Sequence, residues 1–336
     1  MKFCLSTLII LLVMCLVAPA VAQQPTQHAF IWSQKSGMKD LGSLGASSYA
    51  EAVNASGQIV GYFVTNIGDL HAFRWTAKGG MKDLGTLGGN FSVAFGIDDS
   101  GVVVGSASQP SGTVHGVLWT SAGVIKDLGT LGGSSSEALG INKNADIVGD
   151  SSIKGDIATH AFLKIGSRRL RDLGTLGGSS SRANALNLYG VVVGNSTTSS
   201  GDEHAFRWTK AGGMQDLGTL GQTSNAIALN DFSHVVGFSV LVGGSPSHGF
   251  YWTKTAGMQD LGTLGDFGAN SDAFGINKSN AIAGYSYTDH TNSVYHAVLW
   301  QGKNHQISDL GTLGGNNSTS AAINASGTVV GWSDIN

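Results

Sequence analysis

Hydrophobic residues in this chain fall into short runs rather than long periodic segments. Residues 23–336 contain runs of four to six residues rich in Val, Ile, Phe and Trp, bounded by Gly, Ser and Asn. No stretch of ten or more of these residues has apolar positions at the 3.6-residue spacing of an amphipathic helix. Short apolar runs between turn-forming residues are typical of β-strands, so the pattern predicts an all-β fold.

The short runs belong to a unit that repeats about every 44 residues. The heptapeptide Asp-Leu-Gly-Thr-Leu-Gly-Gly, or a close variant, occurs seven times, starting at Asp40, Asp83, Asp127, Asp172, Asp216, Asp260 and Asp309. A His precedes each copy by twelve residues, or by thirteen in the last, at His28, His71, His115, His160, His204, His248 and His296. Repetition at a fixed period of this length indicates a solenoid or a propeller built from similar units.

One repeat accommodates four short strands. In the second repeat the apolar runs predict strands at residues 94–97, 102–106, 115–119 and 125–129. The first two are joined by Asp98-Asp99-Ser100-Gly101, where the leading Asp can bond its own backbone two residues on and the closing Gly accepts a positive φ. Four antiparallel strands in about 44 residues make one blade of a β-propeller.

The order of strands at the two ends of the chain predicts how the ring closes. The sequence after residue 22 opens with third and fourth strands, at residues 28–32 and 38–44, and it ends with first and second strands, at residues 321–324 and 328–333. Six whole blades begin near Glu51, Ala94, Ala138, Ala183, Ala226 and Ala273. We therefore predict a seven-bladed β-propeller of four-stranded antiparallel blades, closed by pairing the N-terminal and C-terminal strands in one blade.

The first 22 residues predict a secretory signal peptide. Lys2 precedes an apolar run of about 14 residues, fewer than the about 20 that a membrane-spanning helix needs. Small side chains at residues 18–22 form a cleavage site just before Gln23. Both cysteines lie in this leader, so we expect residues 23–336 to be a secreted domain without disulfides and without stable membrane insertion.

Three motifs recur in a fixed order along the chain. They are His-Ala-Phe-x-Trp, then Met-x-Asp-Leu-Gly-Thr-Leu-Gly-Gly, then Ala-x-x-Ile-Asn-x-x-Gly-x-Val-Val-Gly. In these motifs residues 28–336 resemble the HAF-repeat family of bacterial extracellular repeat proteins. The resemblance implies secretion and a repeat fold, and it implies no established chemistry. Copies depart from the pattern at Gly116, Lys164, Gln222 and Gly249.

The composition argues against several classes of function. The chain carries 19 Lys and Arg residues against 22 Asp and Glu without a concentrated basic segment, so nucleic acid is not an expected partner. It contains no Gly-x-Ser-x-Gly elbow, no His-Glu-x-x-His motif and no EF-hand loop. The sequence therefore predicts no catalytic residue, no metal site and no cofactor, and we expect a monomer.

Residues that occur in every repeat are expected to serve the blade rather than a single site. Pairing of the third and fourth strands is expected to place His28 opposite Ser43 rather than Asp40, so a His–Ser contact is predicted instead of a His–Asp pair. One Trp on the third strand of most blades predicts packing between blades rather than sugar-stacking platforms. These residues are Trp32, Trp75, Trp119, Trp208, Trp252 and Trp300.

A localised function is expected where one copy breaks the repeat. In an up-and-down blade the second-to-third loops and the blade-to-blade loops emerge on one face of the ring, which then carries every variable loop. The blade starting near Ala273 departs most, in its incoming loop at residues 266–272 and its long second-to-third loop at residues 285–295. The candidate ligand-binding residues are Asp266, Phe267, Asp272, Tyr285, Tyr287, Asp289, His290 and Tyr295. Their rings would supply flat apolar contact and their polar groups hydrogen bonds, whereas the alternative is a surface loop that tolerates insertions.

Three functions from different classes remain open. The first is a secreted, noncatalytic propeller that presents its loops to an extracellular protein or glycan, in the medium, the periplasm or at the cell surface. The second is an extracellular enzyme, a hydrolase or lyase, acting on a polysaccharide or a small molecule at the ring axis. The third is a purely structural surface protein. An aromatic and polar patch on the loop face favours the first, and convergent carboxylates around the axis favour the second.

Overall fold

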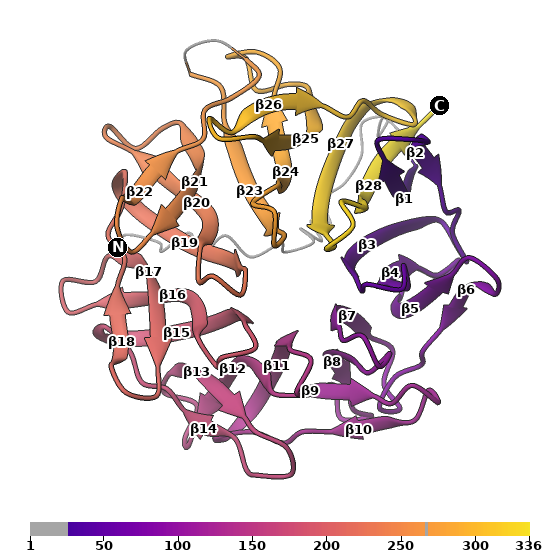
Figure 1. Ribbon diagram of the computed structural model, residues 1–336. Coiled ribbons are helices and arrows are strands. Elements are labelled where there is room, and N and C mark those ends of the chain that lie inside the picture. Colours follow the sequence, from indigo (N-terminus) through magenta and orange to yellow (C-terminus); the bar gives the residue numbers. More distant parts are fainter. Residues whose placement is uncertain (1–25, 266–267) are drawn as a thin grey trace, which may run out of the picture.

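The chain folds into seven four-stranded antiparallel sheets arranged as a closed ring (Figure 1). The computed structural model describes residues 26–265 and 268–336. These residues form 28 strands, so the predicted seven-bladed β-propeller is confirmed. The predicted signal peptide at residues 1–22 lies outside the described residues. Within the described residues, no helix is long and apolar enough to cross a membrane.

Six blades are continuous in sequence, and each runs from the ring axis outward. Blade 1 consists of β3 (Ser47–Val53), β4 (Ile59–Val64), β5 (Leu70–Thr76) and β6 (Gly80–Asp83). Blade 2 consists of β7 (Ser92–Ile97), β8 (Val103–Ser108), β9 (Val114–Trp119) and β10 (Ile125–Asp127). Blade 3 consists of β11 (Gly132–Ile141), β12 (Ile147–Ile153), β13 (Thr159–Lys164) and β14 (Arg171–Asp172). The strands of blade 2 begin and end within two residues of those predicted from the sequence.

The other three continuous blades follow the same plan. Blade 4 consists of β15 (Gly177–Leu186), β16 (Val192–Thr198), β17 (Glu203–Thr209) and β18 (Gly213–Asp216). Blade 5 consists of β19 (Gly221–Leu229), β20 (Val235–Leu241), β21 (Ser247–Thr253) and β22 (Gly257–Asp260). Blade 6 consists of β23 (Ser271–Ile276), β24 (Ile282–Tyr287), β25 (Tyr295–Gln301) and β26 (Gln306–Asp309).

Blade 7 combines strands from both ends of the chain, as predicted. It contains β27 (Gly314–Ile323) and β28 (Val329–Ile335) from the C-terminal end, with β1 (Gln27–Ser33) and β2 (Gly37–Asp40) from the N-terminal end. In Figure 1 the yellow strands β27 and β28 lie beside the indigo strands β1 and β2. The pairing of β1 with β28 extends from Gln27↔Asp334 to Trp32↔Val329 and closes the ring without a covalent link.

Each first strand carries a β-bulge opposite a Gly of the second strand. In blade 1, Ala50 pairs with Gly61 and Ala52 pairs with Val60, which leaves Glu51 as the extra residue. A Cβ atom at Gly61 would lie 1.9 Å from the carbonyl oxygen of Tyr49. The close approach of these two strands therefore requires Gly, which accounts for the Gly that recurs at this position in all seven blades.

The hydrophobic core lies between neighbouring blades. One cluster joins Val236 and Tyr251 of blade 5 to Ile282 and Trp300 of blade 6. The Trp300 ring is fully buried, and its Nε1–H donates a hydrogen bond of 3.0 Å to the carbonyl oxygen of Leu261, between the two blades. The third-strand Trp residues thus pack between blades, as predicted from their one-per-blade occurrence.

Deletion of residues 26–40 tests how far stability depends on closure. It removes β1 and β2, exposes the edge of β28 and opens the ring, so we expect the midpoint of thermal unfolding to fall by more than about 10 °C. The measurement is thermal unfolding followed by circular dichroism. As a control, a permutant that joins residue 336 to residue 26 and opens the loop at Ser111 should unfold close to the parent. Equal midpoints for the deletion and the parent would contradict a closed ring.

Candidate functional site

The His of each repeat bonds to the Asp of the same blade, and the predicted His28–Ser43 contact is wrong. His28 Nδ1 lies 2.8 Å from Asp40 Oδ2. The seven equivalent pairs have Nδ1–Oδ2 distances of 2.7–2.8 Å. Because an ionised carboxylate only accepts, the imidazole must donate through Nδ1–H. The same geometry in all seven blades supports a structural role for the pair.

The register of the outer hairpin explains the error. A three-residue loop joins β1 to β2, with Ser33 paired to Gly37, and Gly37 has a φ of +64°. Asp40 therefore pairs with Phe30, two residues from His28, and it reaches the imidazole diagonally on the same face. The chain then turns away at Gly42, so Ser43 never enters the sheet.

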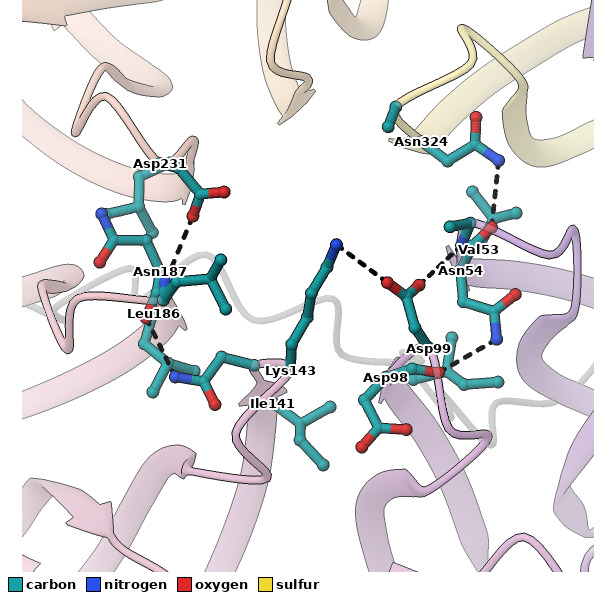
Figure 2. Close-up of a pocket in the computed structure, with 16 residues that line it drawn as sticks. Val53, Asn54, Asp98, Asp99, Ile141, Lys143, Leu186, Asn187, Asp231 and Asn324 are labelled. Carbon is teal, nitrogen blue, oxygen red and sulfur yellow. Dashed lines mark hydrogen bonds and ion pairs between the residues drawn. The ribbon is translucent and has the colours of Figure 1, made fainter.

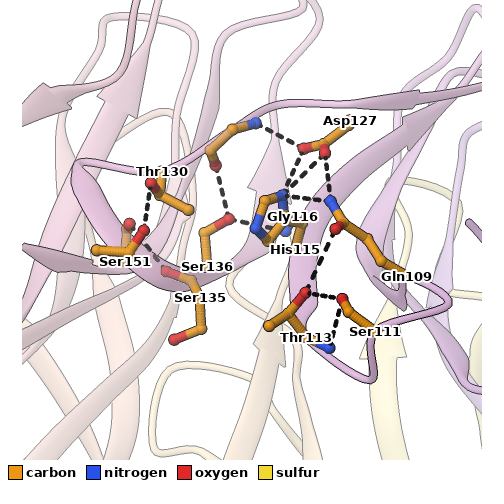
Figure 3. Close-up of polar contacts among 12 residues, drawn as sticks. Gln109, Ser111, Thr113, His115, Gly116, Asp127, Thr130, Ser135, Ser136 and Ser151 are labelled. Atoms are coloured by element: carbon orange, nitrogen blue, oxygen red, sulfur yellow. Dashed lines mark hydrogen bonds and ion pairs between the residues drawn. The ribbon is translucent and has the colours of Figure 1, made fainter. Parts of the chain in front are cut away.

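The Asp and a buried Ser fasten each blade to the next (Figure 3). Asp127 accepts hydrogen bonds from His115 and from the backbone N–H of Gly129, the latter at 2.7 Å. Ser136 of blade 3 accepts the N–H of Gly116 of blade 2 at 2.9 Å and donates to the carbonyl oxygen of Gly129 at 2.7 Å. Seven serines accept a neighbouring blade's N–H in this way, namely Ser48, Ser92, Ser136, Ser181, Ser224, Ser271 and Ser318.

A circle of Asn side chains surrounds the axis on the face of the ring where the first and second strands of each blade join. We call it the amide belt. The side chain of each belt Asn donates through Nδ2 to the carbonyl oxygen of the corresponding residue in the next blade, at 3.0–3.2 Å. The six bonds run from Asn54 to Asp98, Asn142 to Asn187, Asn187 to Asn230, Asn230 to Asn277, Asn277 to Asn324 and Asn324 to Asn54. The bond from blade 2 to blade 3 is missing, because Asp98 has no amide donor.

A cavity of about 230 Å³ lies inside this belt (Figure 2). Lys143 Nζ extends across it to Asp99 at 3.0 Å, while Asp231 accepts the N–H of Leu188 at 3.3 Å. The N–H of Ala55 and then Lys143 hold the pKa of Asp99 below its usual value, and Asp99 raises the pKa of Lys143. Lys143 and Asp99 bond to each other, and Asp99 and Asp231 bond to the backbones of the neighbouring hairpins. The charged side chains of this cavity therefore serve contacts between blades.

The blades differ most in one layer of cross-strand pairs. It lies beside the recurrent Ala–Gly pair, which is Ser320–Gly331 in blade 7. We call these fourteen residues the variable layer. The pairs, from blade 1 to blade 7, are Tyr49–Tyr62, Val93–Ser106, Glu137–Asp150, Arg182–Asn195, Asn225–Phe238, Asp272–Tyr285 and Thr319–Trp332. No residue type is common to all seven blades at these positions. The side chains here can therefore differ between blades, and bind different groups, while the fold stays the same.

Aromatic side chains from three consecutive blades form a continuous row through the variable layer. We call it the aromatic arc. Its members are Phe274, Tyr285, Tyr287 and Tyr295 of blade 6, Trp332 of blade 7, and Tyr49 and Tyr62 of blade 1. Neighbouring ring centroids lie 4.7–6.0 Å apart. Tyr62 is buried and the other six rings are partly exposed, so the arc combines a packed interior with accessible aromatic edges.

Polar groups hold the arc from both sides. Tyr285 donates its hydroxyl to Asp272 Oδ2 at 2.8 Å, and Ser247 of blade 5 donates to Asp272 Oδ1 at 3.2 Å. Removal of this carboxyl from water raises the pKa of Asp272 to about 7, although both hydrogen bonds act to lower it. At the other end, Tyr49 donates to Gln27 at 2.6 Å, and Gln27 donates to the buried Asp334 at 3.0 Å.

The structure brings together half of the predicted ligand-binding residues. Asp272, Tyr285, Tyr287 and Tyr295 meet in the arc, whereas Asp289 bonds to Thr291 within its own loop. His290 is exposed on that loop. Asp266 and Phe267 lie outside the described residues. The predicted loop at residues 285–295 therefore contributes to the aromatic arc through the residues at its two ends.

Sequence reasoning missed the part of the arc that lies in other blades. Trp332 contacts Tyr295 of blade 6 and Tyr49 of blade 1, at centroid distances of 6.0 and 5.8 Å. Both Trp332 and Tyr62 directly follow the recurrent Gly of a second strand. Comparing this position across all seven copies would have revealed the aromatic half of the ring.

Comparison with known proteins establishes the fold and no family. No family model and no curated protein matches this chain. The protein assigned as TolB from Agrobacterium tumefaciens has a TM-score of 0.51 at 11% identity, over 92% of this chain and 98% of that chain. TolB from Acinetobacter baumannii has a TM-score of 0.47 at 12% identity, over 74% of this chain and 62% of its own length. At 11% identity the likeness to the Agrobacterium protein supports the propeller fold and nothing beyond it.

The gap in the amide belt leads to a prediction about stability. Asp98→Asn should keep the acceptor that bonds Ser100 and Val102 and should add the seventh belt bond, to the carbonyl oxygen of Asn142. We expect the free energy of unfolding to rise by about 0.5–1 kcal/mol, with part of the gain offset by lost attraction to Arg74. Asn277→Asp is the converse variant and should cost about 1–3 kcal/mol. Urea denaturation measures both, and destabilisation by Asp98→Asn would contradict the belt.

The raised pKa of Asp272 leads to a prediction about pH. Its folded-state pKa, about 7, exceeds the ordinary value, so the folded state binds the proton more tightly and the contribution to stability is lost as pH rises from about 4 to about 7. Asp272→Asn mimics the protonated form and should gain on the parent over that range, reaching at least about 1 kcal/mol at pH 8. Urea denaturation between pH 4 and pH 8 measures this. A constant difference between the two proteins would show that Asp272 ionises normally.

Proposed function

We propose that this protein is a noncatalytic binding module outside the bacterial cell, and that the aromatic arc binds a glycan. The observation that carries the proposal is the contact of seven aromatic rings across blades 6, 7 and 1, six of them partly exposed. Aromatic faces bordered by hydrogen-bonding groups match the alternating apolar and hydroxylated surfaces of a sugar.

The chemistry of the arc favours a neutral, hydroxylated ligand. Aromatic rings give broad apolar contact that is not specific for charge. The carboxyl groups at the two ends of the arc already accept hydrogen bonds within the protein, Asp272 from Tyr285 and Asp334 from Gln27. A polypeptide ligand is the alternative that also fits aromatic contact, since Tyr and Trp predominate in protein interfaces. We favour a glycan because the arc is a row of rings on strands rather than a broad apolar patch.

Three features of the sequence support an extracellular setting. The leader at residues 1–22 has the organisation of a secretory signal peptide, and residues 28–336 resemble the HAF-repeat family of bacterial extracellular proteins. The domain after the leader contains no cysteine, so it can fold in an oxidising compartment without disulfide chemistry.

Single substitutions in the arc provide the test. Tyr287→Ala, Tyr295→Ala and Trp332→Ala should each weaken binding to a glycan found by array screening about tenfold or more, which corresponds to ~1.4 kcal/mol. Calorimetric titration of each variant with the screened glycan gives the dissociation constant. The matched controls are Tyr189→Ala and Phe232→Ala, since these rings are 77% and 67% exposed on the opposite face.

Three outcomes would overturn the proposal. Unchanged affinity in all three arc variants would place the ligand elsewhere on the ring. Equal losses in the two control variants would mean that the binding is nonspecific. Release of reducing ends from the bound polysaccharide would assign the protein to the enzymes instead.

A further inference from the structure

A second cavity lies away from the arc, in the polar half of the variable layer. Its volume is about 280 Å³. It lies between blades 2 and 3, and one side chain of blade 4 completes its wall. The lining residues are Phe91, Val114, Ser135, Ser136, Glu137, Asp150, Thr159 and Arg182. The wall thus combines two apolar side chains, three hydroxyls and three charged groups.

The charges in this cavity do not balance. Arg182 of blade 4 reaches back to blade 3, with Nη2 at 2.9 Å from Glu137 Oε2 and Nη1 at 3.5 Å from Asp150 Oδ1. The first contact is a hydrogen-bonded ion pair, and the second is too long for a good hydrogen bond. One guanidinium therefore faces two carboxylates, which leaves a charge of −1 when both are ionised.

Asp150 is the group left without a hydrogen bond. Its residue is only 9% exposed, and Oδ1 is buried without a hydrogen-bond partner. A buried carboxylate normally accepts several hydrogen bonds, because burying the charge without them costs free energy. Removal from water raises the pKa of Asp150 to about 6, Arg182 opposes this, and Glu137 adds to it. Within the protein, no donor forms a hydrogen bond to Oδ1.

The scaffold does not require this arrangement. Blade 2 has Val93 and Ser106 at the positions that Glu137 and Asp150 occupy in blade 3, and it closes its sheet in the same register. Among the described pairs of the variable layer, Glu137–Asp150 is the one with two carboxyl groups. A costly feature that the fold does not need, placed on the wall of a cavity, points to a ligand.

We propose that this cavity is a second binding site, and that it takes a primary ammonium group carried on a hydroxylated ring, as in an amino sugar. The ammonium would donate to Asp150 and neutralise the excess charge. Phe91 and Val114 would contact the apolar face of the ring, and the hydroxyl of Thr159 would bond to its hydroxyl groups. Arg182 already pairs with Glu137, so an anionic ligand would meet two carboxylates and is disfavoured.

This site is separate from the proposed glycan site in the arc. Its residues come from blades 2, 3 and 4, whereas the arc comes from blades 6, 7 and 1. The two sites share neither a side chain nor a blade. Either one can therefore exist without the other, and variants in each serve as controls for the other.

The experiment titrates residues 23–336 with glucosamine at pH 7.5. The dissociation constant is compared with those of glucose and N-acetylglucosamine. Glucose replaces the ammonium with a hydroxyl, and N-acetylglucosamine removes its charge. We expect glucosamine to bind at least tenfold more tightly than either neutral sugar. Equal affinities for the three sugars in the parent protein, or no binding of glucosamine, would overturn the proposal without any reliance on a variant.

Variants then locate the binding. Asp150→Asn removes a buried charge and should weaken glucosamine binding at least tenfold, while Asp202→Asn, in an exposed loop of blade 4, should leave it unchanged. Tyr287→Ala in the arc should also leave it unchanged, which separates this site from the proposed glycan site. Unchanged binding in Asp150→Asn would overturn the assignment to this cavity.

A linear amine decides the ligand class. 1,5-Diaminopentane carries the same ammonium group without the sugar ring, and we expect it to bind more weakly than glucosamine. Tighter binding of the diamine would overturn the amino-sugar assignment.

Discussion

Each blade relies on its neighbour to satisfy buried backbone groups. In the third strand, the N–H of Ala29 does not bond within its own sheet but to the hydroxyl of Ser48 in the next blade, at 2.9 Å. Ser48 is fully buried, and its hydroxyl donates a hydrogen bond to the carbonyl oxygen of Gly42 in the linker. In an isolated blade that N–H would bond to water, whereas inside the ring a missing Ser hydroxyl would leave it buried and unpaired, at a cost of about 1–3 kcal/mol for each such group. The ring is therefore expected to form as one cooperative unit.

This dependence explains which residues repeat and which vary. The serines, the His–Asp pairs and the belt asparagines bond across or beside a blade boundary, so changing one copy harms two blades. The variable layer makes no contact that recurs in every blade, since Val93–Ser106 and Glu137–Asp150 occupy the same place in adjacent blades. Side chains in this layer can vary between blades, and they lie on the two strands nearest the ring axis. Both properties make the layer suitable for binding sites.

The sequence predicted what depends on period and alternation. Seven copies, four strands in each and a closing blade split between the chain ends all follow from where apolar runs and turn residues fall. The His–Asp pair was missed because only directly opposite residues were compared, whereas Asp40 pairs with Phe30 and reaches His28 diagonally. The ring contacts of the arc could not be predicted in full, because the approach of Trp332 to Tyr49 depends on how blade 7 packs against blade 1. A residue's neighbours in the next blade are set by how the blades stack, which local patterns do not encode.

The variable layer divides into two chemically distinct halves. Blades 6, 7 and 1 contribute aromatic rings in mutual contact, and blades 3 and 4 contribute Glu137, Asp150 and Arg182. Both halves are built on the same strand positions and are bordered by the same Ala–Gly pairs. Because the backbone is nearly identical under both, the difference in chemistry comes from side chains alone. A ring of similar blades can therefore present two different chemistries at a separation that is set by the blades and not by the side chains.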